Sequence, residues 1–306
     1  MALAPKQVSK LDARPTAILS VDVEDYFHVE AFTDVVSRDS WSGYPSRVVD
    51  NTRVLLDLFD SWNVKSTCFV LGWVAERNPS LVREIVDRGH ELACHSYWHR
   101  LIYKLTPQEF REDTMLAKDV IEQAGGVAVK GYRAPSFSIV QKSKWALDVL
   151  AECGFTYDSS IFPVRHDTYG VPNAPRDPFR IETTGGTIVE CPMTTFRLPV
   201  GPNLPVGGGG YLRIFPLSFT QMGITRAQAE GRSLVTYLHP WEIDPDQPRM
   251  PGRVLSKLRH YSNLSKMAKR LESLAERVRF CPFEGSGLLE NAPLLRGGAF
   301  WESNSN

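Results

Sequence analysis

The stretch Ala17-Ile-Leu-Ser-Val-Asp22 joins an apolar run to a carboxylate, and Val23, Glu24 and Asp25 follow it directly. A short apolar run that ends in polar residues predicts a strand buried on both faces, as in a parallel sheet. In parallel α/β folds, catalytic groups lie at the carboxyl ends of the strands. The three acids at this strand end are therefore candidates for catalysis or metal binding.

Apolar strands and amphipathic helices alternate after this strand. Further strands are expected at 64–71, 90–95, 129–133, 155–158 and 234–238, with helices at 46–62, 81–88, 107–123 and 143–153. Residues 161–217 are rich in Pro and Gly and predict long loops with a short strand at 187–191, whereas 253–280 return to helical spacing. Repeated strand–helix units predict an α/β fold with a parallel sheet, either a barrel or doubly wound.

Polar clusters follow four more of these strands. They are His95-Ser-Tyr-Trp-His99, Arg133-Ala-Pro135, Asp158-Ser-Ser160 and His239-Pro-Trp-Glu242. Because His95 and His99 are four residues apart, one helical turn would place both imidazoles on one face, close enough to bind one metal ion. A carboxylate from the first strand would complete a two-histidine, one-carboxylate site.

The choice of carboxylate depends on where the first strand ends. Side chains alternate along a strand, so Asp22 and Glu24 share one face if the strand extends that far. This favours Asp22 and Glu24 as the working pair. Asp25 is the alternative ligand, because a turn that begins at residue 24 would undo the alternation.

The overall charge argues against a partner held mainly by electrostatics. The 306 residues include 35 Lys+Arg and 35 Asp+Glu, and a nucleic-acid binder usually has a clear basic excess. Residues 253–279 nevertheless contain eight Lys+Arg and two Glu. This segment predicts a solvated basic face over an apolar stripe, with contact to a membrane surface as the alternative.

No apolar run approaches the roughly 20 residues of a membrane span. The first sixteen residues contain Lys6, Lys10, Asp12 and Arg14 and lack the apolar core of a secretory signal, so a cytoplasmic location is expected. Five scattered cysteines without a CxxC pair predict reduced thiols.

Six segments in this order resemble the polysaccharide deacetylases of carbohydrate esterase family 4, the nodulation-type deacetylase superfamily. They are Leu19 to Asp25, Ser66 to Gly72, Gly89 to His99, Gly131 to Ser136, Tyr157 to Ser160 and Tyr237 to Trp241. The Asp22-Val-Glu-Asp-Tyr-Phe27 opening, the Gly-rich segment before Tyr211 and the His239-Pro-Trp-Glu-Ile-Asp-Pro245 run are similar to the branch found in exopolysaccharide loci beside exosortase systems.

The resemblance implies a distorted (β/α)7 barrel over residues 16–245. A short N-terminal tail (1–15) would precede it. A basic amphipathic helical extension (246–282) would follow and pack on the barrel, and a second tail (283–306) would end the chain.

The resemblance also implies roles for individual residues. Asp22 looks like the catalytic base, Arg133 like the partner that keeps it ionised and His239 like the general acid, while His95 and His99 look like metal ligands. The commonest family motif has two adjacent aspartates, but here Val23 follows Asp22, and the Asp-x-Glu form supports Glu24 as the third ligand. The residues expected to contact substrate are Pro135, Tyr97, Trp98 and Trp241.

The expected activity is metal-dependent removal of N-acetyl groups from amino sugars of a polysaccharide or a lipid-linked oligosaccharide, in exopolysaccharide biosynthesis. The cofactor would be one divalent ion, Zn²⁺ or another first-row metal. One alternative is hydrolysis of a cyclic amide or imide on the same fold, as in allantoinase-like relatives. Another is a carbohydrate-binding scaffold that has lost catalysis.

Three features near the motifs have simpler interpretations. Cys94 would point away from the face of His95 as a buried thiol, and His90 would make structural hydrogen bonds. Gly207 to Gly210 is not followed by Lys-Ser/Thr, so it predicts a flexible loop and not a phosphate loop.

Overall fold

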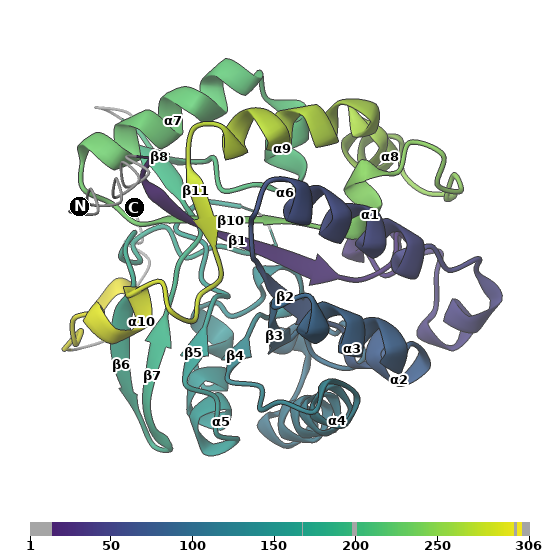
Figure 1. Cartoon of the computed structure of the whole chain (residues 1–306). Helices are drawn as coiled ribbons and strands as arrows, with labels where there is room; N and C mark the ends of the chain where they lie inside the picture. The colour runs from purple at the N-terminus through teal and green to yellow at the C-terminus, as the bar shows by residue number, and fades with distance from the viewer. Residues whose placement is uncertain (1–13, 167, 198–200, 297–298, 302–306) are drawn as a thin grey trace, which may run out of the picture.

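The computed structural model describes residues 14–166, 168–197, 201–296 and 299–301, and a curved parallel sheet is its centre (Figure 1). The strands follow the order β10-β1-β2-β3-β4-β5-β7-β6, and β11 pairs with β1. Every pair in this sheet is parallel except β6 with β7. The strands are β1 (Thr16–Val23), β2 (Thr67–Val70), β3 (Glu91–Cys94), β4 (Gly131–Tyr132), β5 (Tyr157–Asp158), β6 (Phe179–Thr183), β7 (Gly186–Glu190), β10 (Leu234–Leu238) and β11 (Arg279–Cys281), with β8 (Thr195–Arg197) and β9 (Asn203–Pro205) in a separate hairpin.

Helices cover the outside of the sheet, and Figure 1 shows α1 to α5 along one side with α7 and α9 on the other. They are α1 (Val48–Ser61), α2 (Gly72–Arg77), α3 (Pro79–Asp87), α4 (Pro107–Gly125), α5 (Ala146–Glu152), α6 (Gly209–Ile214), α7 (Leu217–Ala229), α8 (Val254–Tyr261), α9 (Met267–Ala275) and α10 (Leu288–Asn291). Thr106 and Glu109 form a reciprocal capping box at the start of α4, as the sequence predicts. Every residue of β1 after Thr16 is buried, which explains its apolar run.

The seven parallel strands from β10 to β7 match the barrel expected, but backbone pairing between strands does not close it in the described residues. Irregular backbone covers the free edge of β10 instead. The amide of Thr194 donates to the carbonyl of Val235 at 3.2 Å, and the amide of Tyr237 donates to the carbonyl of Gly207 at 2.8 Å. The barrel is therefore distorted beside β10, where Thr194 and Gly207 take the place of a neighbouring strand.

The Gly-rich segment is fixed against β10, so the expectation of a flexible loop is wrong. Gly208 has φ 121°, and a Cβ there would lie 2.0 Å from the carbonyl oxygen of Tyr237. Only glycine allows the two backbones to approach this closely. The run thus positions the strand that carries His239.

The C-terminal segment is not one helical stretch over 253–280. Asn263 adopts φ 55° between α8 and α9, and this left-handed residue separates the two helices. After α9, β11 pairs with Thr16 to Ile18 of β1. The segment expected to be an extension on the barrel therefore also contributes a strand to its sheet.

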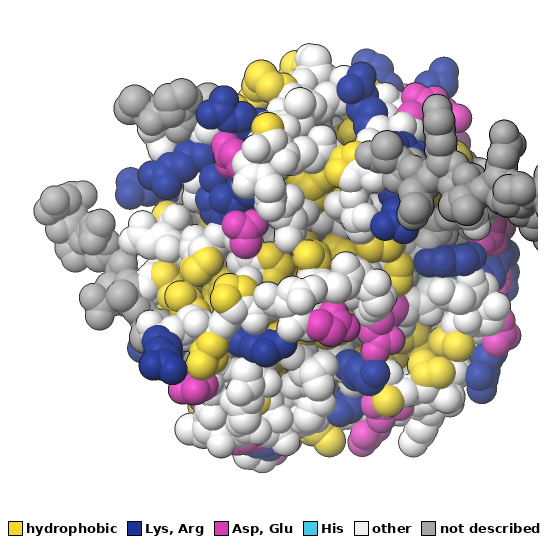
Figure 2. All heavy atoms as spheres, turned by 60° about the vertical axis from the view of Figure 1, so that its left-hand side comes forward, with side chains coloured by type: hydrophobic (Ala, Val, Ile, Leu, Met, Phe, Trp, Pro, Cys, Tyr) yellow, Lys and Arg dark blue, Asp and Glu magenta, His cyan; other side chains and the backbone are white. Residues whose placement is uncertain are grey.

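Residues 283–296 and 299–301, which the structure describes, are not a free tail. Phe283, Ala292 and Trp301 are buried, and Leu294 bridges to Arg180 of β6. Figure 2 shows positive and negative side chains interspersed on the neighbouring face, which agrees with the balanced composition. In the part of the chain that the structure describes, no helix is long and apolar enough to cross a membrane.

Candidate active site

Six side chains from the sequence prediction lie at one end of the sheet. They are Asp22 and Glu24 at β1, His95 and His99 after β3, Arg133 after β4 and His239 after β10. These strands are parallel members of one sheet, so their carboxyl ends open on the same side. All six are buried except His239, which is partly exposed.

Glu24, His95 and His99 converge on one point. Each offers a ligand atom, and the three atoms lie within 4.8 Å of one another. The Nε2 atom of His99 is 2.9 Å from Oε2 of Glu24, and this buried carboxylate oxygen has no hydrogen-bond partner among the described residues. A buried oxygen without a hydrogen bond is costly unless another group satisfies it, and a cation would do so.

A hydrogen bond to the backbone fixes the orientation of His95. The Nδ1 atom of His95 lies 2.8 Å from the backbone carbonyl of Arg133, so Nδ1–H donates there and Nε2 keeps its lone pair for the cluster. Burial lowers the pKa of His95 to about 4, which keeps the imidazole neutral. A neutral imidazole is the form that binds metal.

A loop, and not a helical turn, brings the two histidines together. β3 ends at Cys94, and Ser96 and His99 both have positive φ, at 61° and 49°. The Oγ atom of Ser96 accepts the amide of His99 at 3.1 Å, and the two imidazole centroids are 5.3 Å apart. The expected proximity is therefore present, but the helical argument for it is wrong.

Asp25 lies outside the cluster and has a structural role. Its carboxylate accepts hydrogen bonds from the hydroxyl of Ser46 at 2.7 Å and from the amides of Arg47 and Val48, at the start of α1. A carboxylate in this position satisfies free amides of the first helical turn. Glu24 is thus the acid that the structure brings to the histidines.

Asp22 forms an ion pair with Arg133, whose Nη1 donates to Oδ1 at 2.6 Å. The guanidinium is fully buried, and it also donates to Ser20 and twice to Ser159. It lies 4.1 Å from the ring centroid of Phe69. Arg133 therefore has one fixed position, with its positive charge against the Asp22 carboxylate.

A pair of buried carboxyls lies close to this arginine. Burial raises the pKa of Asp158 to about 6, and burial together with the charge of Asp158 raises the pKa of Glu190 well above its usual value. The hydroxyl of Ser160 donates to Asp158, and the amide of Ile161 donates to Glu190 at 3.0 Å. We expect the pair to hold a shared proton, because two buried like charges repel.

His239 is oriented by Glu242, a residue that the sequence analysis placed at this strand end without a role. Glu242 Oε2 accepts the amide of His239 at 3.1 Å and lies 3.5 Å from its Nδ1 atom. On the other side of the ring, Nε2 lies 3.6 Å from Glu24 and 3.9 Å from Asp22. Burial alone lowers the pKa of His239, but Glu242, Glu24 and Asp22 outweigh it and raise the pKa above its usual value.

The sequence analysis missed Arg213. This buried side chain donates from Nε to Glu242 at 2.8 Å, and its Nη1 donates to the carbonyls of Arg259, His260 and Ser262. Burial alone would raise the pKa of Glu242, but Arg213 and His239 hold it at about 2. The spacing of His239 and Glu242, three residues apart, is typical of a capping box and indicates a role for Glu242. It does not indicate Arg213.

The four residues expected to contact substrate are placed differently. Trp241 stacks on His239 with centroids 4.9 Å apart and lines a cavity of about 480 Å³ with Tyr237 and Tyr211. Tyr97 is buried and its hydroxyl donates to Glu76. Pro135 is buried beside Arg133, and Trp98 is half-buried. The substrate contacts of these three stay predictions.

Two neighbours behave as the sequence predicts. Cys94 is a fully buried thiol whose pKa burial raises, and Nδ1 of His90 accepts the amide of Ser66 at 3.1 Å. Both are structural residues.

Two family models together span most of the chain. Residues 39–157 match the model described as "Polysaccharide deacetylase", and residues 159–286 match "Domain of unknown function (DUF3473)". The first range holds His95, His99 and Arg133, and the second holds His239, whereas Asp22 and Glu24 precede both.

Proteins named as deacetylases are similar in sequence to about a third of this chain. The chain is 33% identical over 98 residues to a peptidoglycan-N-acetylglucosamine deacetylase of Bacillus cereus, covering 32% of this chain and 36% of the relative. It is 30% identical over 97 residues to a chitooligosaccharide deacetylase of Bradyrhizobium, covering 32% and 42%. The match thus spans less than half the length of either relative.

A solved structure shares the fold over most of the chain. A polysaccharide deacetylase structure from Mycobacterium smegmatis, titled as putative, superposes with a TM-score of 0.53 at 24% identity, covering 91% of this chain and 94% of that one. The expected α/β fold is therefore confirmed.

Proposed function

We propose, from the premise that residues 39–157 belong to the polysaccharide deacetylase family, that this protein is a metal-dependent hydrolase that removes N-acetyl groups from amino sugars. Its substrate would be a polysaccharide or a lipid-linked oligosaccharide. The observation that carries the proposal is one cluster: Asp22, held by buried Arg133, lies beside three converging metal-ligand side chains and 3.9 Å from His239.

Glu24, His95 and His99 fit a divalent cation of the zinc type. Two imidazole nitrogens and one carboxylate oxygen are common catalytic zinc ligands, and three protein ligands leave a position for water and substrate. A bound cation would supply polarisation of the acetyl carbonyl and acidification of a water molecule.

Asp22 is placed to accept the proton of the attacking water. The buried guanidinium of Arg133 holds Oδ1, and Oδ2, which does not make that contact, lies 3.9 Å from His239. Because Arg133 is held by Ser20, Ser159 and Phe69, the carboxylate has one preferred orientation.

His239 is placed to complete the reaction as general acid. Its raised pKa favours the protonated ring, whose Nε2–H faces the carboxylates while Nδ1 faces Glu242. It would protonate the leaving amine as the C–N bond breaks, giving acetate and a free amino sugar. Glu242 and Arg213 act as positioning residues for this ring.

A substrate panel tests this proposal. The metal-loaded protein should release acetate from N-acetylated glucosamine oligosaccharides and leave cyclic ureides such as allantoin intact. Turnover of the cyclic amides alone would favour the allantoinase-like alternative. Tight glycan binding without release of acetate would favour the scaffold alternative.

The place of this reaction in exopolysaccharide synthesis and in the cytoplasm also belongs to the proposal. The exopolysaccharide role is supported by the resemblance of the Asp22 to Phe27 and His239 to Pro245 segments to that branch of the family. Loss of the polymer, or a fully N-acetylated polymer, after deletion of the gene would test it.

The proposal includes contact of the C-terminal basic segment with a membrane surface through α8. Val254, Leu255 and Leu258 are 79%, 56% and 64% exposed on this helix, an unusual density of exposed aliphatic side chains. Lys257 and Arg259 flank them and are exposed. An apolar stripe beside cations fits the surface of an anionic bilayer.

A further inference from the structure

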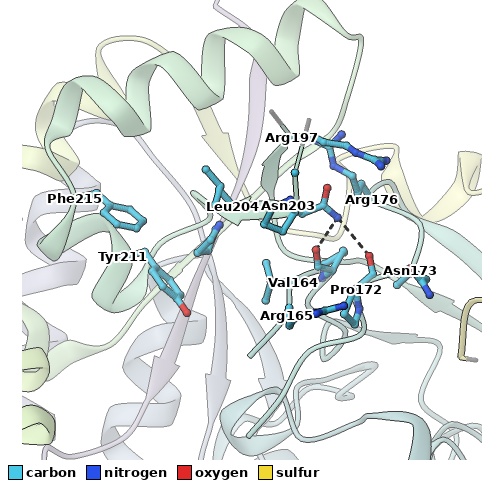
Figure 3. A pocket seen from close by; sticks show the side chains of 15 residues that line it. Val164, Arg165, Pro172, Asn173, Arg176, Arg197, Asn203, Leu204, Tyr211 and Phe215 are labelled. Carbon is cyan, nitrogen blue, oxygen red and sulfur yellow. Dashed lines mark hydrogen bonds between the residues drawn. The ribbon is translucent and has the colours of Figure 1, made fainter. Parts of the chain in front are cut away.

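A second cavity, of about 870 Å³, is lined by three arginines (Figure 3). Arg165 and Arg176 come from the loops after β5, and Arg197 is the last residue of β8. Figure 3 shows Tyr211 and Phe215 on one side of this cavity, with Arg176 and Arg197 on the other.

This cavity shares two lining residues with the one beside the candidate active site. Tyr211 and Phe215 line both, and the 480 Å³ cavity reaches Tyr237 and Trp241. Trp241 stacks on the His239 ring, and the Tyr237 ring contacts the same His239 ring edge-on, at 5.7 Å between centroids. A chain of sugar residues whose acetamide lies at His239 could therefore extend past the aromatic rings to the arginines.

The cavity wall is built to stay in place. Asn203 donates to the carbonyls of Pro163 at 2.8 Å and Pro172 at 3.5 Å, which links the two sides of the loop region. The guanidinium of Arg176 donates to the hydroxyl oxygen of Thr195 at 2.9 Å and to the backbone carbonyl of Thr195 at 2.6 Å. These hydrogen bonds hold Arg176 and Asn203 in the cavity wall.

The charge of this cavity is positive. None of its described lining residues is Asp or Glu. Glu230 lies 3.7 Å from Arg176, but Arg165 and Arg197 have no carboxylate within ion-pair distance among the described residues. Burial lowers the pKa of Arg176, and the charges of Arg232 and Arg197 add to this effect, while Glu230 and Asp177 oppose it.

We propose that this cleft binds an anionic group of the glycan substrate, away from the acetamide that is hydrolysed. This inference rests on the proposed function and narrows its substrate to a negatively charged N-acetylated glycan. Guanidinium groups bind carboxylates and phosphates through paired hydrogen bonds, and aromatic rings such as Tyr211 and Phe215 pack on sugar faces. The anion could be a uronate carboxylate within the glycan or the diphosphate of its carrier, and both share this chemistry.

Equilibrium binding distinguishes a uronate carboxylate from a carrier diphosphate, and it does not require the protein to hydrolyse the probe. Isothermal titration would use metal-loaded full-length protein with three probes: a neutral N-acetylglucosamine tetramer, a tetramer that alternates glucuronate with N-acetylglucosamine, and uridine diphosphate N-acetylglucosamine. We expect an anionic probe to bind about tenfold more tightly than the neutral tetramer at low salt, with the difference falling as salt is raised. Preference for the glucuronate tetramer identifies a uronate, and preference for the nucleotide sugar identifies the diphosphate.

Variants assign the preference to this cleft. The Arg165→Gln/Arg197→Gln double variant should lose the anionic preference and keep its affinity for the neutral tetramer. Arg83→Gln, which changes an exposed arginine on α3, is the matched control and should bind like wild type. Equal binding of all three probes, or a preference that survives the double variant, overturns the inference.

Release of acetate from the neutral tetramer is measured separately. If no probe is deacetylated while the anionic preference holds and depends on Arg165 and Arg197, the proposed function fails and the cleft stands as an anionic glycan site. If the neutral tetramer is deacetylated without any charge preference, the proposed function stands and this inference fails.

Discussion

Arg133 Nη1 donates to Asp22 Oδ1 at 2.6 Å, and neither side chain is more than slightly exposed. The two residues are 111 positions apart, so the pair exists only because β1 and β4 belong to one parallel sheet. It joins the proposed base to the loop that also holds His95 through the carbonyl of Arg133. Arg133 therefore contacts both the proposed base and His95, one of the three proposed metal ligands.

Asp22→Asn should reduce kcat by about 10²–10⁴, because the amide cannot accept the proton of the attacking water. It should also lower the free energy of unfolding by about 3 kcal/mol, since Arg133 would keep a buried charge without a carboxylate partner. Acetate release and urea denaturation measure the two effects. Asp57→Asn, at an exposed ion pair on α1, should change neither, and full activity in Asp22→Asn would remove this residue from the role of base.

Glu242→Gln should move the basic limb of the pH–rate profile to lower pH by about one unit. A general acid works while protonated, so the rate falls as the pH rises through the pKa of His239. The Glu242 carboxylate raises that pKa, and its neutral replacement removes this effect.

Steady-state rates from pH 5 to 10 measure the limb. Glu272→Gln, an exposed change on α9, should leave the profile unchanged. An unmoved basic limb in Glu242→Gln would mean that His239 is not the acid or that Glu242 does not set its pKa.

Gly208→Ala should destabilise the protein by about 2 kcal/mol or more and reduce activity. Its φ of 121° is strained for alanine, and the added Cβ would lie 2.0 Å from the carbonyl of Tyr237. Thermal unfolding and acetate release give the two values. Gly43→Ala, where a Cβ meets nothing within 4 Å, is the matched control, and equal stability of the two variants would contradict a fixed glycine segment.

Leu255→Gln/Leu258→Gln should reduce binding to vesicles that contain phosphatidylglycerol by about tenfold or more, because two exposed leucines lose their apolar contact with the bilayer. Co-sedimentation at several salt concentrations measures it, with phosphatidylcholine vesicles as the neutral comparison.

Val54→Gln changes a half-exposed side chain on α1 and should bind as wild type does. Absence of binding by the wild type, or self-association through α8 seen by sedimentation, would contradict membrane contact.

Much of the site could be predicted from the sequence because it depends on strand ends. An apolar run followed by polar residues indicates a strand and the end of the strand at which a site is expected. Each motif of this kind predicted its own candidates, which are Asp22, Glu24, His95, Arg133 and His239. Their convergence then follows from parallel pairing, which places all carboxyl ends on one side.

Other features depend on contacts between distant segments. Arg213 meets Glu242 and three carbonyls at the C-terminal end of α8, and nothing near residue 213 indicates these partners. The break at Asn263 and the pairing of β11 with β1 are likewise set by packing, because apolar spacing continued through both. Asp25 was ambiguous because the cap it makes on α1 lies 22 residues away.

The most direct test is a titration of metal-free protein with Zn²⁺ and other first-row divalent ions, in which bound metal and acetate release are measured on the same samples. We expect acetate release from an N-acetylated glucosamine oligosaccharide to rise with occupancy and to saturate at about one ion per chain. His95→Ala should lose both the bound ion and the activity, while His166→Ala, outside the ligand cluster, should keep the ion. Full acetate release by the metal-free protein, or unchanged metal binding by His95→Ala, would contradict the account.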